Sequence, residues 1–193
     1  MKKTWLTFFI LILTTQAGLP KIRNCGVFVA YETLTMAMNN FQNFAGEIGW
    51  RFHPTHQFRL TIMETELTER HLASKLENTA VDGKNVFGYY RGYELSHDKF
   101  YGNNFYFSTS IGYAENYYEH KLTDENLTNK TWTFGSGIGY SGHRLLGIKN
   151  LYYNLSLPIR FYLNRIEEQQ WQDATIHPHV IMKNIWFFIG YKF

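Results

Sequence analysis

The last nine residues constrain the fold of this chain more than any other stretch. Residues 185–193 (IWFFIGYKF) place an apolar or aromatic side chain at every second position, up to the terminal Phe193. Successive side chains of a β-strand point to opposite faces, so this alternation creates one continuous apolar stripe. The pattern predicts a β-strand that faces lipid, while the other face carries Trp186, Phe188, Gly190 and Lys192.

The start of the chain predicts export. Lys2 and Lys3 precede an apolar run at residues 5–13, and residues 15–17 (TQA) offer the small side chains that signal peptidase requires. The run is too short to cross a bilayer, which takes about 20 apolar residues. We therefore expect a cleaved signal peptide at 1–17 and one mature domain at 18–193. Cys25 follows no lipidation tripeptide and is the single cysteine, so neither a lipid anchor nor an intrachain disulfide is expected.

The composition fits a barrel that interleaves lipid-facing and lumen-facing side chains. Aromatic residues make up 18% of the chain, yet the mean hydropathy is only −0.33, as expected when apolar and polar residues alternate. The formal net charge of +3 includes the two lysines of the signal peptide. This small charge gives no electrostatic basis for a nucleic-acid partner.

Period-two alternation recurs along the whole mature chain. Clear strands are predicted at 44–52, 57–67, 104–118, 130–140 and 151–163, in addition to 185–193. Residues 26–36 and 85–95 are less regular. In the second of these, Arg91 and Glu94 have opposite parity, and a β-bulge would reconcile them. The eight segments together predict an all-β protein, an eight-stranded antiparallel transmembrane up-and-down β-barrel.

The connections between these strands alternate in length, as expected of a membrane barrel with short periplasmic turns and long extracellular loops. With a periplasmic N-terminus, the periplasmic links are 53–56, 96–103 and 141–150. The extracellular links are 37–43, 68–84, 122–129 and 164–179. The two longest, 68–84 and 164–179, both fall on the extracellular side.

Charged residues on the lumen-facing parity predict a polar core. Glu47, Arg51, Arg59 and Arg160 are expected to meet inside as a mixed-charge network, with Glu32 as a further candidate. An eight-stranded barrel is just wide enough for side chains to fill. Mutual compensation of buried charges is therefore favoured over the alternative, a gated path for protons or small ions.

Candidate sites for chemistry are weak. The pair in residues 177–179 (HPH) supplies two ligands, whereas a stable zinc site takes three or four. Residues 96–98 (SHD) contain the types of a catalytic triad, but consecutive residues do not easily stack as nucleophile, base and orienting group. No catalytic, cofactor or metal site is therefore predicted. For the enzymatic alternative, the residues to test first would be Glu64, Glu66, Glu69, Glu115, His71 and His120.

The terminal stripe of Ile189, Tyr191 and Phe193 resembles the last strand of bacterial outer-membrane barrels, where this strand and its final aromatic are recognised by the β-barrel assembly machinery. The mature chain is similar in architecture to the small eight-stranded class of opacity-type surface antigens and the membrane domain of outer-membrane protein A. The resemblance implies a bacterial outer-membrane protein that lies among lipids, needs no cofactor and has no enzymatic activity. Its loops at 68–84 and 164–179 would contact envelope components, host surfaces or other ligands. A lipid A-modifying enzyme and a narrow solute channel are the alternatives.

Overall fold

The computed structural model describes residues 25–38, 43–67, 72, 81–102, 104–177 and 180–193. The expected signal peptide at 1–17 lies outside these residues, as does most of the link at 68–84.

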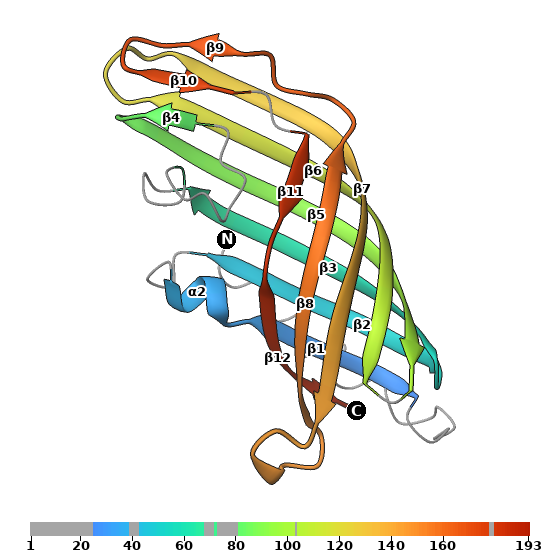
Figure 1. The fold of residues 1–193 in the computed structure, drawn as a ribbon. Coiled ribbons are helices and arrows are strands. Elements are labelled where there is room, and N and C mark those ends of the chain that lie inside the picture. Colours follow the sequence, from blue (N-terminus) through green and yellow to red (C-terminus); the bar gives the residue numbers. More distant parts are fainter. Residues whose placement is uncertain (1–24, 39–42, 68–71, 73–80, 103, 178–179) are drawn as a thin grey trace.

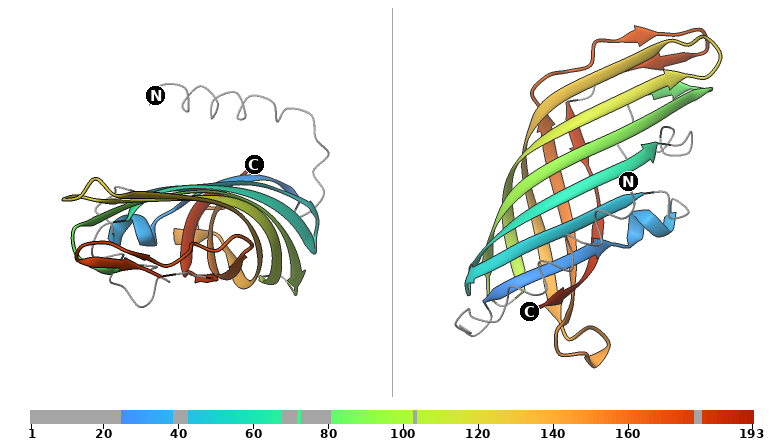
Figure 2. Two further views of the ribbon diagram at one scale, coloured as in Figure 1. Left: turned by 90° about the horizontal axis from the view of Figure 1, so that it is seen from above. Right: turned by 180° about the vertical axis from the view of Figure 1, so that it is seen from behind.

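The described residues form a single closed antiparallel sheet with a small second sheet at one end (Figure 1). The main sheet runs in the order β11-β8-β12-β1-β2-β3-β5-β6-β7, and it closes because β7 also pairs with β8. Seen from above, its strands curve around a common interior (Figure 2). The wall strands are β1 (Gly26–Glu32), β2 (Phe44–His53), β3 (His56–Leu67), β5 (Val86–Tyr101), β6 (Phe105–His120), β7 (Asn126–His143), β8 (Leu151–Tyr162), β11 (Ile181–Lys183) and β12 (Trp186–Lys192).

Two of the nine strands in the wall occupy one position. β11 pairs with the end of β8 at Ile159 and Phe161, and β12 pairs with the earlier part of the same strand. β11 and β12 are therefore successive parts of one interrupted strand, and the wall has eight strand positions. The predicted eight-stranded antiparallel up-and-down barrel is confirmed.

The two faces of each strand differ as the alternation predicts. On β8, Leu155 and Leu157 are exposed on the outer wall, whereas Asn154 and Ser156 are buried in the lumen. On β12 the lumen face is itself aromatic, with Trp186 and Phe188 in the buried core. Because side chains alternate with a period of two, a shift of one residue in a strand's pairing would move all of its side chains to the other face. The pairing register therefore determines which side chains of each strand face the lumen.

The first strand is shorter than predicted. The expectation of one strand at 26–36 is wrong, because β1 ends at Glu32 and the helix α2 (Leu34–Met38) follows. The Glu32 carboxylate accepts backbone N–H groups from Leu34, Thr35 and Met36. A carboxylate in this position caps the helix start, which satisfies N–H groups that a helix leaves without partners.

The predicted β-bulge at 85–95 is also wrong. β5 keeps an unbroken register with β6 from Val86 to Tyr101. Glu94 is buried inside, and Arg91 lies on the outer wall, where its Nε is 2.9 Å from Glu64 Oε1. A cross-strand ion pair outside, rather than a bulge, accommodates the opposite parity of Arg91 and Glu94.

Three links are shorter than expected, because alternation continues into segments whose polar residues resemble turns. β5 extends through most of the predicted link 96–103, and Ser96, Asp98 and Phe100 face the lumen. β7 begins inside the predicted link 122–129 and ends inside 141–150. The link after β7 retains a 3-10 turn, η1 (Leu145–Gly147).

The described parts of the two longest links form a cap at one end of the barrel (Figure 1). The cap is a three-stranded sheet of β4 (Val81–Gly83), β10 (Ala174–Ile176) and β9 (Gln169–Gln170). Short segments of both predicted links are thus part of a regular sheet, whereas residues 68–71 and 73–80 lie outside the described residues. The cap has its own apolar core, in which Leu72, Val81, Ile166, Ala174 and Ile176 pack on Val86 and Tyr118 of the wall.

The wall is unequal in height around the barrel. β5 and β6 have 16 residues each and β7 has 18, whereas β1 and β12 have seven each. The tall strands continue towards the cap and carry it, as the view from behind shows (Figure 2).

Candidate functional site

The lumen contains two polar clusters, and Arg59 of β3 is the centre of the first. Its Nη1 lies 2.8 Å from Glu47 Oε2, and its Nε and Nη2 lie 2.6 and 3.1 Å from the Asp98 carboxylate. The Tyr152 hydroxyl donates to Glu47 at 3.1 Å, and Gln57 donates to Asp98 at 2.6 Å. One guanidinium thus bridges two carboxylates, and neutral donors satisfy their remaining oxygens, as buried charges require.

The second cluster joins opposite parts of the wall. Arg160 of β8 forms a buried ion pair with Glu94 of β5, and Ser96 donates a further hydrogen bond to Glu94 at 3.2 Å. The Arg160 guanidinium also lies 4.1 Å from the centroid of the Trp186 ring. An aromatic face stabilises a cation at this distance when water is excluded. The cluster therefore connects two non-adjacent strands, β5 and β8, across the lumen.

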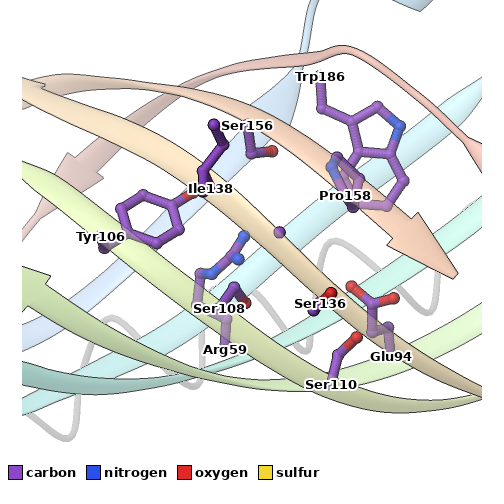
Figure 3. Close-up of a pocket in the computed structure, with 11 residues that line it drawn as sticks. Arg59, Glu94, Tyr106, Ser108, Ser110, Ser136, Ile138, Ser156, Pro158 and Trp186 are labelled. Atoms are coloured by element: carbon purple, nitrogen blue, oxygen red, sulfur yellow. The ribbon is translucent and has the colours of Figure 1, made fainter.

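The space between the two clusters is small. Arg59, Glu94, Tyr106 and the neighbouring serines line a cavity of about 10 Å³ (Figure 3). A cavity of this size holds about one water molecule. The lumen beside this cavity is tightly packed: a Cβ added at Gly139 would lie 2.2 Å from Cζ of Tyr106. The lumen is a packed polar core at this level of the barrel.

The four predicted lumen residues do not form one network. The structure brings Glu47 and Arg59 together, whereas Arg160 pairs with Glu94 instead. Arg51 faces the lumen near the other rim, with its guanidinium 3.8 Å from the Phe100 ring centroid. Its Nη2 donates to the Pro54 carbonyl. Glu32, the further candidate, caps α2 and also accepts the backbone N–H of Phe187.

Sequence reasoning missed Glu94 and Asp98, the acids that complete both clusters. The parity conflict between Arg91 and Glu94 prevents the assignment of Glu94 to either face from the sequence alone. Asp98 was placed in a turn. The signal that identifies both is the continuation of strict alternation along β5, where residues 94, 96, 98 and 100 all face inward and are buried.

The Ser96, His97 and Asp98 side chains do not converge as a catalytic triad. Ser96 and Asp98 are buried in the lumen, and His97, with opposite parity, lies on the outer wall. There His97 Nε2 is 3.1 Å from Nδ1 of His56. The barrel wall therefore separates the imidazole from both oxygens, and the expected position of these residues in a turn is corrected to mid-strand.

The other residues named for an enzymatic alternative are dispersed. Glu64 pairs with Arg91 on the outer wall, and Glu115 lies 3.3 Å from Lys130 on the same face. His120 is buried beneath the cap. Glu66 also has a partner, while Glu69 and His71 lie outside the described residues.

The histidine pair considered for metal binding has one described member. His177 Nε2 lies 3.2 Å from Asp82 Oδ2, and its Nδ1 lies 3.6 Å from Glu168 Oε2. The two carboxylates thus approach opposite ring nitrogens and not a common point. His179 lies outside the described residues. Within the described part of the chain, no group of three or more potential ligands is arranged for a metal ion.

His120 ties the cap to the wall. It has no exposed surface, and its Nε2 bonds to Asp173 Oδ1 while its Nδ1 lies 2.8 Å from the Thr123 hydroxyl. Asn85 donates to the other Asp173 oxygen at 2.7 Å. The hydrogen bonds from His120 and Asn85 hold the pKa of Asp173 below its ordinary value. Because His120 lies on the wall and Asp173 in the cap, the cap is fixed by polar contacts as well as by its core.

The residues predicted as the assembly signal end the closing seam. Ile189 and Tyr191 pair with Tyr31 and Val29 of β1. The Phe193 ring lies 5.2 Å from that of Tyr191, and the Phe193 N–H donates to the Val27 carbonyl at 3.0 Å. Their recognition by the assembly machinery stays a prediction.

These features define a small eight-stranded transmembrane-type β-barrel with a packed polar lumen and a folded cap at one end. Among the described residues, none of the helices is long and apolar enough to span a membrane.

No family model matches the chain, and no curated protein matches it. Among solved structures, it is similar to Ail, the attachment invasion locus protein of Yersinia pestis, at 11% identity and a TM-score of 0.45 over 88% of this chain and 97% of that one. The N-terminal β-barrel domain of Pseudomonas aeruginosa OprF matches at 12% identity and a TM-score of 0.41, covering 88% and 96%. Neisserial surface protein A matches at 10% identity and a TM-score of 0.42, covering 88% and 94%. Likenesses at these identities and TM-scores identify neither a family nor a function.

Proposed function

We propose that this protein is a non-enzymatic barrel of the bacterial outer membrane whose cap is a preformed surface for contact with extracellular or envelope components. The observation that carries the proposal is the cap itself. The described parts of the links at 68–84 and 164–179 contribute a three-stranded sheet with its own core, and the buried His120 of β6 anchors this sheet to the wall. A surface that is ordered before binding loses less conformational entropy when a partner docks.

The outer wall supports the membrane location. Large apolar side chains are exposed along it, including Trp132, Phe134, Ile138, Leu155 and Leu157. A contiguous apolar belt of this kind is unfavourable in water and matches the lipid-facing band of a membrane barrel.

The chain ends and the link lengths support the orientation. The terminal Phe193 lies beside Gly26 at the rim opposite the cap (Figure 1). At this rim β2 and β3 are joined by a two-residue turn between His53 and His56. Because outer-membrane barrels keep short turns in the periplasm and longer connections outside, the cap is assigned to the extracellular side.

The cap surface is acid-rich. Within the described residues of the two cap links, the exposed carboxylates of Asp82, Glu167, Glu168 and Asp173 outnumber the cations Lys84 and Arg165. Complementary charge favours encounters with cationic partners and disfavours anionic ones. The proposal therefore includes contact with cationic surfaces or protein segments.

The two alternatives have less support. A narrow channel requires a continuous aqueous path, whereas the lumen around Arg59 and Glu94 retains a cavity for about one water. Single-channel recording in planar bilayers tests it. A lipid A-modifying enzyme requires a convergent nucleophile and base, and Ser96 and His97 lie on opposite faces of β5. Mass spectrometry of lipid A from cells with and without the protein tests that alternative.

The orientation is tested by cysteine labelling on intact cells. Cys25→Ser provides a background without cysteine, into which Gln172→Cys on the cap or Lys149→Cys on the opposite turn is introduced; both side chains are exposed. We expect a membrane-impermeant maleimide to label the first variant on intact cells and the second only after lysis. Labelling of the Lys149 variant alone would reverse the orientation and remove the basis of the proposal.

The contact role is tested separately with cells that display the wild type or Ile176→Asp, which disrupts the cap core. We expect cells that display the wild type to adhere more strongly to a surface coated with a cationic peptide than cells that display the variant. Both barrels should be present in the membrane at equal levels. Leu163→Asp, at an exposed wall position outside the cap core, is the matched control. Equal retention by wild type and the Ile176 variant would contradict contact through the cap.

A further inference from the structure

We propose that the rim of the lumen opposite the cap binds a small water-borne oxyanion between Arg51, His143 and Lys192. This site lies at the other end of the barrel from the proposed contact surface. It therefore stands independently of the role assigned to the cap.

The topology brings the three side chains to one rim. Arg51 of β2 pairs with Gly26 of β1, and Lys192 of β12 pairs with Phe28 of the same strand. Since Gly26 and Phe28 share one face, and Phe28 is buried in the lumen core, Arg51 and Lys192 both project inward, one from each neighbour of β1.

His143 completes the rim from the other side of the seam. It is the last residue of β7, and its partner on β8 is Tyr152, which in turn pairs with Gly190 of β12. Lys192 Nζ lies 3.2 Å from His143 Nδ1 and 4.8 Å from the centroid of the Tyr152 ring. The ammonium group therefore contacts a neutral acceptor and an aromatic face.

Among the residues that the structure describes, the cationic side chains of this rim have no carboxylate in direct ion-pair contact. Within the described residues, no carboxylate forms an ion pair with Arg51 or Lys192, the terminal carboxylate of Phe193 included. The two nearest lumen acids are already engaged: Glu47 accepts from Arg59 and Tyr152, and Asp98 accepts from Arg59 and Gln57. Unpaired buried charge is costly, and an anion would offset it.

Arg51 provides the independent observation that points to a ligand. Its side chain is 4% exposed, and its Nε is buried without a hydrogen-bond partner. Buried guanidinium nitrogens are normally satisfied. Phe100 holds the guanidinium plane at 3.8 Å, and the Pro54 carbonyl accepts from Nη2, so Nε remains as a free, preoriented donor.

The chemistry of the rim suits phosphate or a comparable oxyanion. The planar guanidinium offers a directional N–H, and Lys192 adds an ammonium charge. His143, whose Nδ1 accepts from Lys192, carries its proton on Nε2 and contributes that N–H as a donor. A simple halide would leave the directional donors poorly used, so the inferred ligand class is an oxyanion.

The test is isothermal titration of refolded full-length protein in zwitterionic micelles with inorganic phosphate, at an ionic strength held constant with sodium chloride. We expect saturable binding, weakened at least tenfold by Arg51→Gln and by Lys192→Gln. The matched control is Lys99→Gln, which removes an exposed cation on the outer wall near the same rim. Its binding should equal that of the wild type.

If the Arg51 variant fails to fold, Lys192→Gln still tests the site, because Lys192 lies at the end of β12. Circular dichroism and heat-modifiable gel migration verify that each variant forms a barrel. A second titration uses short-chain phosphatidylglycerol. Phosphate binding that both glutamine variants lose supports the proposal. Non-saturable binding, unchanged affinity in both variants, or binding of the lipid alone would overturn it.

Discussion

Glu94 of β5 and Arg160 of β8 form a buried ion pair across the lumen, although their strands are not neighbours in the wall. Removing one partner leaves a buried charge without compensation. We expect Arg160→Met to lower the free energy of unfolding by about 3–5 kcal/mol. The double variant Glu94→Gln/Arg160→Met should recover part of this loss, as measured by urea titration of refolded barrel. Equal stability of the wild type and the single variant would show that the Glu94–Arg160 ion pair does not stabilise the barrel.

The facing of β8 is tested by arginine substitution. Leu157 is exposed on the outer wall near mid-strand, and Leu163 is exposed just beyond the end of the strand. We expect Leu157→Arg to cost about 2–4 kcal/mol in a lipid-refolded barrel and Leu163→Arg about 0–1 kcal/mol, because the penalty falls from the bilayer midplane to the interface. Equal costs at the two positions would show that the lipid band is misplaced.

Gly139 leaves room for a ring and is not replaceable by alanine. Its added methyl would lie 2.2 Å from Cζ and 2.3 Å from the hydroxyl oxygen of Tyr106, which donates to Asn154 at 2.8 Å. We expect Gly139→Ala to destabilise the barrel by about 1–3 kcal/mol through overpacking. The Gly139→Ala change should cost less free energy of unfolding when Tyr106→Leu has already removed the ring. If the double variant lost as much free energy of unfolding as the two single variants together, this contact would be contradicted.

The terminal aromatic is tested by its effect on assembly. Deleting Phe193 removes the ring that contacts Tyr191. We expect slower insertion and an accumulated periplasmic precursor, because the terminal stripe is the predicted recognition feature. Pulse labelling followed by outer-membrane fractionation measures the delay, and Phe193→Tyr, which keeps an aromatic ring, serves as control. Normal insertion of the deletion variant would count against the signal.

The cap should loosen in acid. Hydrogen bonds from His120 and Asn85 lower the pKa of Asp173 from its ordinary 3.8. A carboxylate with a lowered folded-state pKa contributes stability that is present above the unfolded value and is lost as the pH falls through the folded value. We therefore expect the protection factors of amides in β9 and β10, which correct for the intrinsic pH dependence of exchange, to fall as the pH drops below about 4. In the Asp173→Asn variant, the same amides should be less protected at neutral pH, and their protection should depend less on pH.

The strands were predictable because period-two alternation is a local property that survives in the fold. It assigned both faces of β8 and placed Glu47 and Arg59 on the same side of the wall. The partner of Arg160 was not predictable, because a contact across the lumen depends on barrel width and strand stagger, which no single segment encodes. The cap escaped detection for a related reason: β9 and β10 have two and three residues, and tertiary contacts around Ile176 and His120, not local pattern, make them strands.

The unequal wall has a consequence for how the barrel forms. The tall β5, β6 and β7 are consecutive, so each pairing joins nearby chain segments and pays little loop-closure entropy. The β1–β12 seam joins the two ends of the chain through five paired positions, Phe28 to Glu32. Long-range pairing of this kind is slow. The same seam carries Ile189, Tyr191 and Phe193, so we expect closure of the cylinder to be the slowest of the strand pairings and changes at these three residues to delay it.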